Sequence, residues 1–94
     1  MNIRDSAAGK DCAVRLPGIC NRDPATTVHA HFRLVNVSGM GLKVPDFMGA
    51  RACSACHAYI DTHHDDATQL AFAHGCFRTQ VDLHKEGLLR IGHG

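Results

Sequence analysis

The chain has 94 residues, enough for one domain with a small core, and we expect a single domain over residues 1–94. Ten Lys and Arg balance nine Asp and Glu, which argues against a strongly basic nucleic-acid coat. No apolar run approaches the ~20 residues of a membrane span. The first residues, MNIRDSAAGKDC, lack the apolar core of a signal peptide. The sequence therefore predicts a cytoplasmic chain with no membrane partner.

The first candidate feature along the chain is a pair of cysteines, Cys12 and Cys20. Five cysteines is an odd number for a disulfide framework, and cytoplasmic thiols stay reduced. Pro17-Gly18 lies between the pair and is a strong turn signal. A turn there would bring both thiols together, so we predict a metal-binding knuckle.

The remaining elements follow from local pattern. The β-branched and aromatic segment TTVHAHFRLV (26–35) predicts a strand, and the Gly- and Pro-containing segment 36–47 predicts a loop. Helix formers predict a helix over 54–63, and helical spacing of apolar residues predicts a longer one over 65–87. LLRI (88–91) is interpreted as a short terminal strand.

A second cysteine pair, Cys53 and Cys56, opens the shorter predicted helix as C-x2-C. Together with Cys12 and Cys20 it offers the four soft ligands that tetrahedral Zn²⁺ prefers. A site closed by four cysteines has no open position, so its role would be structural. The alternatives are a redox C-x2-C pair or four ordinary buried thiols. Cys76, among apolar residues of the long helix, is interpreted as a core thiol.

Histidines supply a second group. His57 and Asp61 are four residues apart, so a helix places them on one face, where a divalent ion could bridge them. The alternative is an exposed helical His with an Asp partner. His29 and His31 share one side of the predicted strand, and Arg33 continues that side. A neutral imidazole can act as general base, a cation can neutralise a phosphate, and Arg can bind one. These residue types suit phosphodiester hydrolysis.

At this point the chain resembles a known family. The order C…C, AHFR, loop, PDF, CSACH is similar to the HNH, or His-Me finger, endonucleases, which have a ββα-metal core and a zinc clamp of four cysteines. RLPGIC, AHFRL, ACSACH and KEG resemble more closely the small lambdoid-prophage nucleases of the YbcO type. The resemblance covers nearly the whole chain. It implies an α+β fold with a ββα-metal core, a four-cysteine zinc knuckle and a C-terminal helix, in one HNH-like nuclease domain.

The resemblance also implies roles for single residues. His31 matches the general-base His, and His57 matches a metal-binding His. Asp61 stands where some members have a second His, so His57 and Asp61 would hold the catalytic ion, Mg²⁺, Mn²⁺ or Zn²⁺. Two positions depart from the family. Asp46 stands at its middle Asn position, and Ala30 replaces a frequent acidic or His ligand.

The sequence is therefore compatible with two functions. The first is a metal-dependent DNA endonuclease of phage or prophage origin, with Arg33 as a phosphate contact. The second is a non-catalytic zinc module that binds nucleic acid or protein. Scattered cations could form a local basic groove for a duplex, namely Arg15, Lys43, Arg51 and Arg78. A domain this small could also act as a homodimer that engages both strands.

Overall fold

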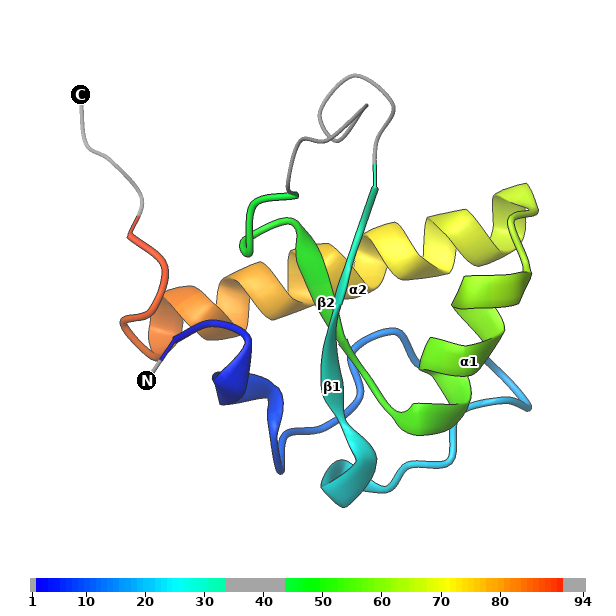
Figure 1. Ribbon diagram of the computed structural model, residues 1–94, viewed down its shortest axis with the longest axis horizontal. Helices are drawn as coiled ribbons and strands as arrows, with labels where there is room; N and C mark the ends of the chain where they lie inside the picture. Colours follow the sequence, from blue (N-terminus) through cyan, green and yellow to red (C-terminus); the bar gives the residue numbers. More distant parts are fainter. Residues whose placement is uncertain (1, 34–43, 91–94) are drawn as a thin grey trace.

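The computed structural model describes residues 2–33 and 44–90. It has the predicted α+β class, with a two-stranded sheet and two α-helices (Figure 1). The elements in chain order are η1 (Asp5–Ala7), η2 (Pro24–Thr26), β1 (Val28–His31), β2 (Gly49–Ala52), α1 (Ser54–Thr62) and α2 (Asp66–Lys85). Within the described ranges, no helix is long and apolar enough to cross a membrane.

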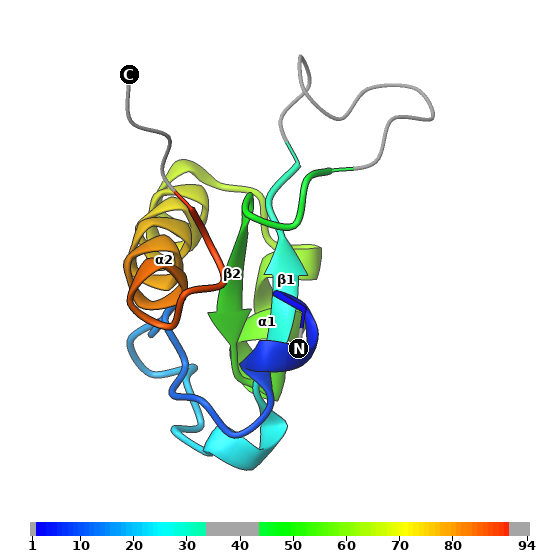
Figure 2. The same cartoon turned by 90° about the vertical axis from the view of Figure 1, so that its left-hand side faces the viewer.

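The two-stranded sheet packs against both helices, α2 along β2 and α1 against both strands. β1 pairs antiparallel with β2, with Val28 opposite Ala52 and His31 opposite Gly49. Figure 2 shows α2 on one side of β2, and β1 with α1 on the other. All four residues of β2 are buried, because both sides of the strand are covered. The molecule thus has an α2 side and an opposite β1–α1 side.

No local pattern in the sequence predicts the strand β2. Its residues, GARA, have low strand propensity, so pairing and burial rather than local preference produce the strand. Its small side chains also let α2 approach closely. A Cβ added at Gly75 would lie 3.0 Å from Val14 Cα and 3.2 Å from Ala50 Cβ. Gly75, unfavourable inside a helix, is therefore explained by this close contact.

Both predicted helices are confirmed. The helix expected over 54–63 is α1, and the one expected over 65–87 is α2. Asp65 caps α2, since its carboxylate accepts hydrogen bonds from the backbone N–H and hydroxyl of Thr68 at 3.2 and 2.7 Å. Gly87, with φ +77°, follows the end of the helix. Cys76 is buried in the core as expected.

Three expectations for irregular or strand segments have mixed outcomes. The strand expected over 26–35 is present as Val28–His31, while residues 34 and 35 lie outside the described part. Residues 44–47 of the expected loop form neither helix nor strand, and 36–43 lie outside. A terminal strand over 88–91 is wrong for residues 88–90. The N–H groups of Leu88 and Leu89 donate to the Leu83 carbonyl instead, closing the end of α2, and residue 91 lies outside.

The expectation that Arg51 joins a basic groove is also wrong. Its side chain is buried, with 3% exposed, and forms a bidentate ion pair with Glu86 at 2.8 and 2.9 Å. Arg51 Nη2 also donates to Ser6 Oγ at 3.1 Å. The guanidinium therefore joins the N-terminal turn to the end of α2. Arg78 likewise donates to the Ala13 carbonyl, at 2.8 Å, and Lys43 lies outside the described residues.

Candidate functional site

The two predicted cysteine pairs come together in one cluster. Sγ atoms of Cys12, Cys20, Cys53 and Cys56 all lie within 4.8 Å of one another, and Cys20 and Cys53 are 3.8 Å apart. Tetrahedral zinc with Zn–S bonds of about 2.3 Å requires S–S separations of about 3.8 Å. All five cysteines lie in the described residues and are free thiols, so no disulfide competes. The cluster could therefore hold one metal ion such as zinc.

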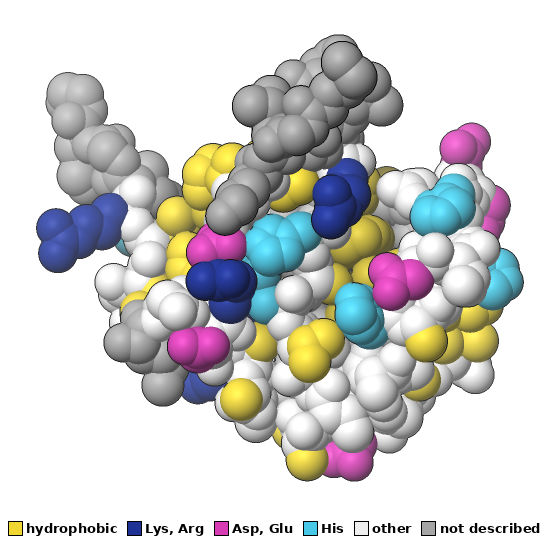
Figure 3. All heavy atoms as spheres, in the orientation of Figure 1, with side chains coloured by type: hydrophobic (Ala, Val, Ile, Leu, Met, Phe, Trp, Pro, Cys, Tyr) yellow, Lys and Arg dark blue, Asp and Glu magenta, His cyan; other side chains and the backbone are white. Residues whose placement is uncertain are grey.

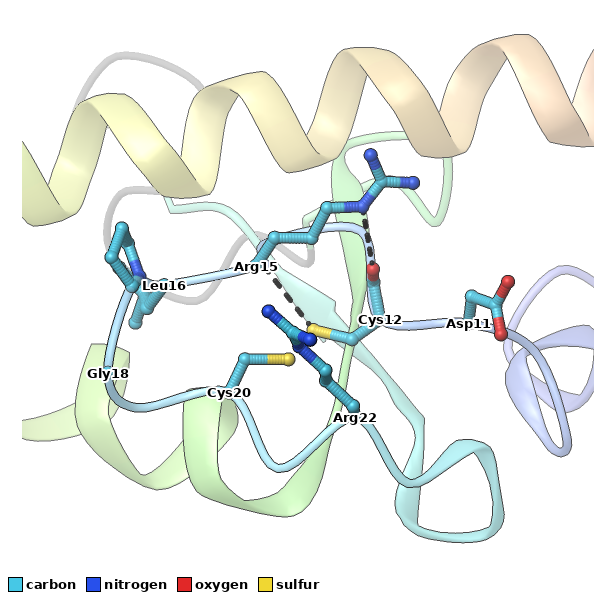
Figure 4. A pocket seen from close by; sticks show the side chains of 8 residues that line it. Asp11, Cys12, Arg15, Leu16, Gly18, Cys20 and Arg22 are labelled. Atoms are coloured by element: carbon cyan, nitrogen blue, oxygen red, sulfur yellow. Dashed lines mark hydrogen bonds between the residues drawn. The ribbon is translucent and has the colours of Figure 1, made fainter.

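Local backbone structure aims the sulfurs inward. After Cys12 the chain turns through Arg15, whose φ is +54° and whose N–H donates to Cys12 Sγ at 3.5 Å (Figure 4). Gly18, with φ +73°, completes the predicted turn before Cys20. In Figure 4 the thiols of Cys12 and Cys20 point toward one another across this knuckle. On the other side, Cys53 caps α1 by accepting the N–H of Cys56 at 3.4 Å.

The thiols strongly influence one another's ionisation. Burial raises the pKa of Cys53, but N–H groups of Cys56 and Asn21 and the neighbouring thiols outweigh it and lower the pKa to about 7. Burial raises the pKa of Cys56 and of Cys20, and the adjacent thiols, Cys12 included, raise both further. Four thiolates this close repel one another, and a bound divalent cation would remove that repulsion. The chemistry of this donor set therefore fits a cation such as Zn²⁺.

A second set of polar side chains lies on the β1–α1 side. Figure 3 shows His, acidic and basic side chains gathered on this face. His31, at the end of β1, is hydrogen-bonded through Nε2 to Asp46 Oδ1 at 3.0 Å. That bond lowers the pKa of Asp46, and Arg4, 3.7 Å from Asp46 Oδ2, lowers it further. Asp46 is thus a carboxylate at neutral pH, so His31 Nε2 must carry the hydrogen.

His29 binds the backbone of Asp46, in the same loop. Its Nε2 lies 2.6 Å from the carbonyl oxygen of Asp46, which can only accept, so this nitrogen donates. Burial lowers the pKa of His29, so the ring is neutral at physiological pH. Gly49, which pairs with His31 in the sheet, leaves room for the His29 ring, since a Cβ there would meet His29 itself and lie 2.8 Å from the Ala30 carbonyl oxygen. His29 therefore positions Asp46.

Helix α1 brings the remaining predicted residues to this face. His57 Nε2 and Asp61 Oδ2 are 3.7 Å apart, one turn of helix from each other; the His57 side chain is half-buried and Asp61 is exposed. Asp61 shares a surface hollow of about 270 Å³ with His31 and Arg33. This hollow is also lined by His64, Ile60, Gln69 and Phe72, whereas His57 is not among its lining residues. The structure therefore brings His31, Arg33 and Asp61 around one hollow, with His57 beside Asp61.

Sequence reasoning missed two contributors to this face. Arg4 reaches Asp46 from the N-terminal segment, 42 positions away, and no local pattern indicates that contact. His64 lines the hollow, although the sequence analysis assigned it no role. The doublet His63–His64 directly after the helix was the available signal. His63 instead stacks on Tyr59, with ring centroids 3.7 Å apart.

These observations define a class of protein: a small α+β chain with a four-cysteine cluster and a strand that carries histidines. Residues 1–88 match the family described as "Putative nuclease YbcO". The chain is 45% identical over 93 residues to proteins of that name from Escherichia coli K12 and from Enterobacteria phage 82, covering 95% of this chain and 97% of each relative.

A solved structure agrees with these relationships. It is described as a putative bacteriophage protein from Escherichia coli K-12 MG1655, and it matches with a TM-score of 0.75 and 43% identity. The match covers 92% of this chain and all of the other. The chain therefore belongs to the YbcO family, as the sequence resemblance predicted.

Proposed function

We propose that this chain is a metal-dependent DNA endonuclease, a single HNH-like domain over residues 1–94 with a ββα-metal core made by β1, β2 and α1. The observation that carries the proposal is the hydrogen bond between His31 and Asp46 beside the hollow that contains Arg33 and Asp61. The family name, which contains the word nuclease, supports a phosphodiester hydrolase. The phage 82 relative supports a phage or prophage origin.

His31 would act as the general base. Because Nε2 donates to the Asp46 carboxylate, the other ring nitrogen, Nδ1, is the one with a free lone pair. Nδ1 can accept a proton from a water molecule that attacks the phosphorus. Asp46 then stabilises the resulting imidazolium across a 3.0 Å contact. An aspartate at the family's Asn position is thus compatible with activity, because it still accepts the hydrogen bond.

Arg33 and the α1 residues would bind the phosphate and the ion. Arg33 lines the same hollow as His31 and can contact a phosphate oxygen. His57 and Asp61 offer a nitrogen and an oxygen 3.7 Å apart, close enough for both to reach an ion at about 2.1 Å. Such an ion, Mg²⁺, Mn²⁺ or Zn²⁺, would act as a Lewis acid on the scissile phosphate.

The cysteine cluster would hold a structural zinc. Cys12, Cys20, Cys53 and Cys56 fill all four positions of a tetrahedron and leave no position for a substrate. The ion would fasten the N-terminal knuckle to the start of α1. Since α1 also carries His57 and Asp61, this zinc would set the position of the proposed catalytic ion.

The proposal is tested by incubating the protein with supercoiled plasmid DNA and Mg²⁺ or Mn²⁺. Conversion to nicked or linear DNA, abolished by EDTA and restored by the added ion, is expected. The alternative function, a zinc module that binds nucleic acid or protein, is favoured by Ala30 at a frequent ligand position. It predicts retention of the plasmid on a native gel without any strand cleavage.

A further inference from the structure

Large apolar side chains are exposed on the outer face of α2. Leu70 is 57% exposed, Phe77 64% and Val81 52%, although a single helix of a small domain normally turns such residues inward. At ~100° per residue they fall in one stripe about 40° wide. The residues that pack on the sheet side lie on the opposite face of the helix, including Phe72, Thr79 and Leu83. We call Leu70, Phe77 and Val81 the outer stripe.

Two shallow hollows border the outer stripe and share Phe77. One, of about 270 Å³, is lined by Phe32, Met48, Ala73, Cys76, Phe77 and Gln80. The other, of about 480 Å³, includes Phe47 and Leu89 beside Phe77 and Val81. The apolar surface therefore extends sideways from α2, with Phe77 as a ridge between two depressions. A ridge beside a depression of similar chemistry can match a second copy of itself.

The charges at the two ends of α2 have opposite signs. Asp66 lies in the first turn, and His84 and Lys85 lie in the last. Two α2 helices packed antiparallel would set each acidic end against the other copy's basic end. Their helix dipoles would oppose each other favourably as well. A parallel arrangement would instead place like charges together.

We propose that the outer stripe is the interface of a symmetric homodimer in which two α2 helices pack antiparallel. When Asp66 of each copy is set opposite Lys85 of the other, Leu70 falls opposite Val81 twice. Phe77 then falls opposite the His74 turn, next to the hollow lined by Ala73. The same register satisfies the charges and the apolar residues, which is the argument for a second copy as the occupant.

The size of this surface limits the strength of the dimer. A 20-residue helix is about 30 Å long and ~10 Å wide, so its face alone is smaller than the roughly 800 Å² per partner found in stable complexes. The dimer is therefore weak and reversible, with a dissociation constant in the micromolar range. Figure 2 shows β1, which carries His29 and His31, on the opposite side of β2 from α2, so both copies would keep the β1–α1 side open. The inference is independent of the proposed nuclease activity.

Sedimentation velocity over a range from low micromolar to millimolar concentration tests the proposal. Wild type should pass from monomer to dimer, and Phe77→Asp should raise the dissociation constant at least about thirtyfold, since it places a charge at the centre of the interface. Val28→Asp is the matched control, because Val28 is another exposed apolar residue, 43% exposed, on β1. It should dimerise as wild type does. Circular dichroism checks that each variant is folded, with Val81→Asp as a second interface variant.

A charge exchange tests the antiparallel register. Asp66→Lys and Lys85→Glu should each weaken the dimer about threefold to tenfold, and the double variant should restore the wild-type constant. Restoration is specific to a geometry in which position 66 of one copy meets position 85 of the other. A wild type that stays monomeric throughout, a dimer unaffected by both Phe77→Asp and Val81→Asp, or a double variant weaker than either single one would overturn the proposal.

Discussion

The carboxylate of Asp46 accepts a hydrogen bond from Nε2 of His31 over 3.0 Å, between residues 15 positions apart in the chain. This contact selects the ring tautomer and leaves Nδ1 as the proton acceptor. Removing it should leave the domain folded, because Asp46 is partly exposed. It should nevertheless let the imidazole rotate and populate the wrong tautomer.

Asp46→Ala should therefore reduce metal-dependent cleavage about tenfold or more, up to the 10²–10⁴ that general-base catalysis contributes when it is lost completely. Asp46→Asn keeps an oxygen acceptor at the same place and should retain most activity. Single-turnover cleavage rates at matched protein and zinc content measure the difference. Equal losses in the two variants would show that the negative charge, rather than the hydrogen bond, is what His31 requires.

The cysteine cluster should contain one zinc per chain. Cys53→Ser should lose the metal and unfold the domain, because binding free energy at a structural zinc, on the order of 10 kcal/mol, is folding free energy. Cys76→Ala is the control, since Cys76 is buried away from the cluster and burial raises its pKa to about 12. Elemental analysis and thermal melting of both proteins measure the effect. Reduced, folded protein without zinc would refute the structural assignment.

The motif CSACHAYID should divide between two sites. Cys56 is buried in the cluster, whereas His57, the next residue, is partly exposed on the same face as Asp61. His57→Ala should keep the zinc and the fold and lose cleavage, and Cys56→Ser should lose zinc first. Metal content and activity are measured on the same preparations. Loss of the tightly bound zinc in His57→Ala would place this residue in the structural site instead.

The ion pair of Arg51 with Glu86 should make stability depend on pH. The hydrogen bonds from Arg51 lower the pKa of Glu86 below its ordinary 4.5. Its contribution to stability is therefore present above pH 4.5 and is lost as the pH falls through the lowered value. Glu86→Gln should reduce the free energy of unfolding at neutral pH by about 1–3 kcal/mol, because Arg51 stays buried without its partner charge.

Denaturant unfolding of wild type and Glu86→Gln, at neutral pH and below pH 4.5, measures this difference. The difference in the free energy of unfolding between wild type and Glu86→Gln should become smaller in acid. Any effect of acid on the zinc site is common to both proteins. Lys10→Gln serves as the control, since the exposed Lys10 is 4.0 Å from Glu86 and its loss should change little. If this difference in the free energy of unfolding does not change with pH, the Arg51–Glu86 ion pair is not the source of the pH dependence.

Local signals explain which parts could be predicted from sequence. The spacing of Cys12 and Cys20 around a Pro-Gly turn, and the C-x2-C at a helix start, are short-range patterns, and the cysteines do converge. The helix α2 carries apolar residues at helical spacing, although Leu70, Phe77 and Val81 among them lie on its exposed face. His57 and Asp61 lie on one helical face for the same reason.

The features that sequence analysis did not predict depend on contacts between residues far apart in the chain. β2 is a strand because β1 and α2 cover it, although GARA itself does not favour one. Arg51 was expected at the surface. No local pattern indicates that it is buried, because its ion-pair partner, Glu86, lies 35 positions later in the chain. The contact of Arg4 with Asp46 is equally distant. Each of these features depends on tertiary contacts, which the periodicity and residue types of a short segment do not reveal.

The most direct test of the central claim compares wild type with His31→Ala in cleavage of supercoiled plasmid with Mg²⁺ or Mn²⁺. Both proteins should be folded and contain equal zinc, because His31 is outside the cysteine cluster. The account predicts cleavage by wild type and a rate lower by about 10²–10⁴ in His31→Ala. Equal rates in the two proteins, or a wild type that cuts no DNA with any divalent ion, would contradict it.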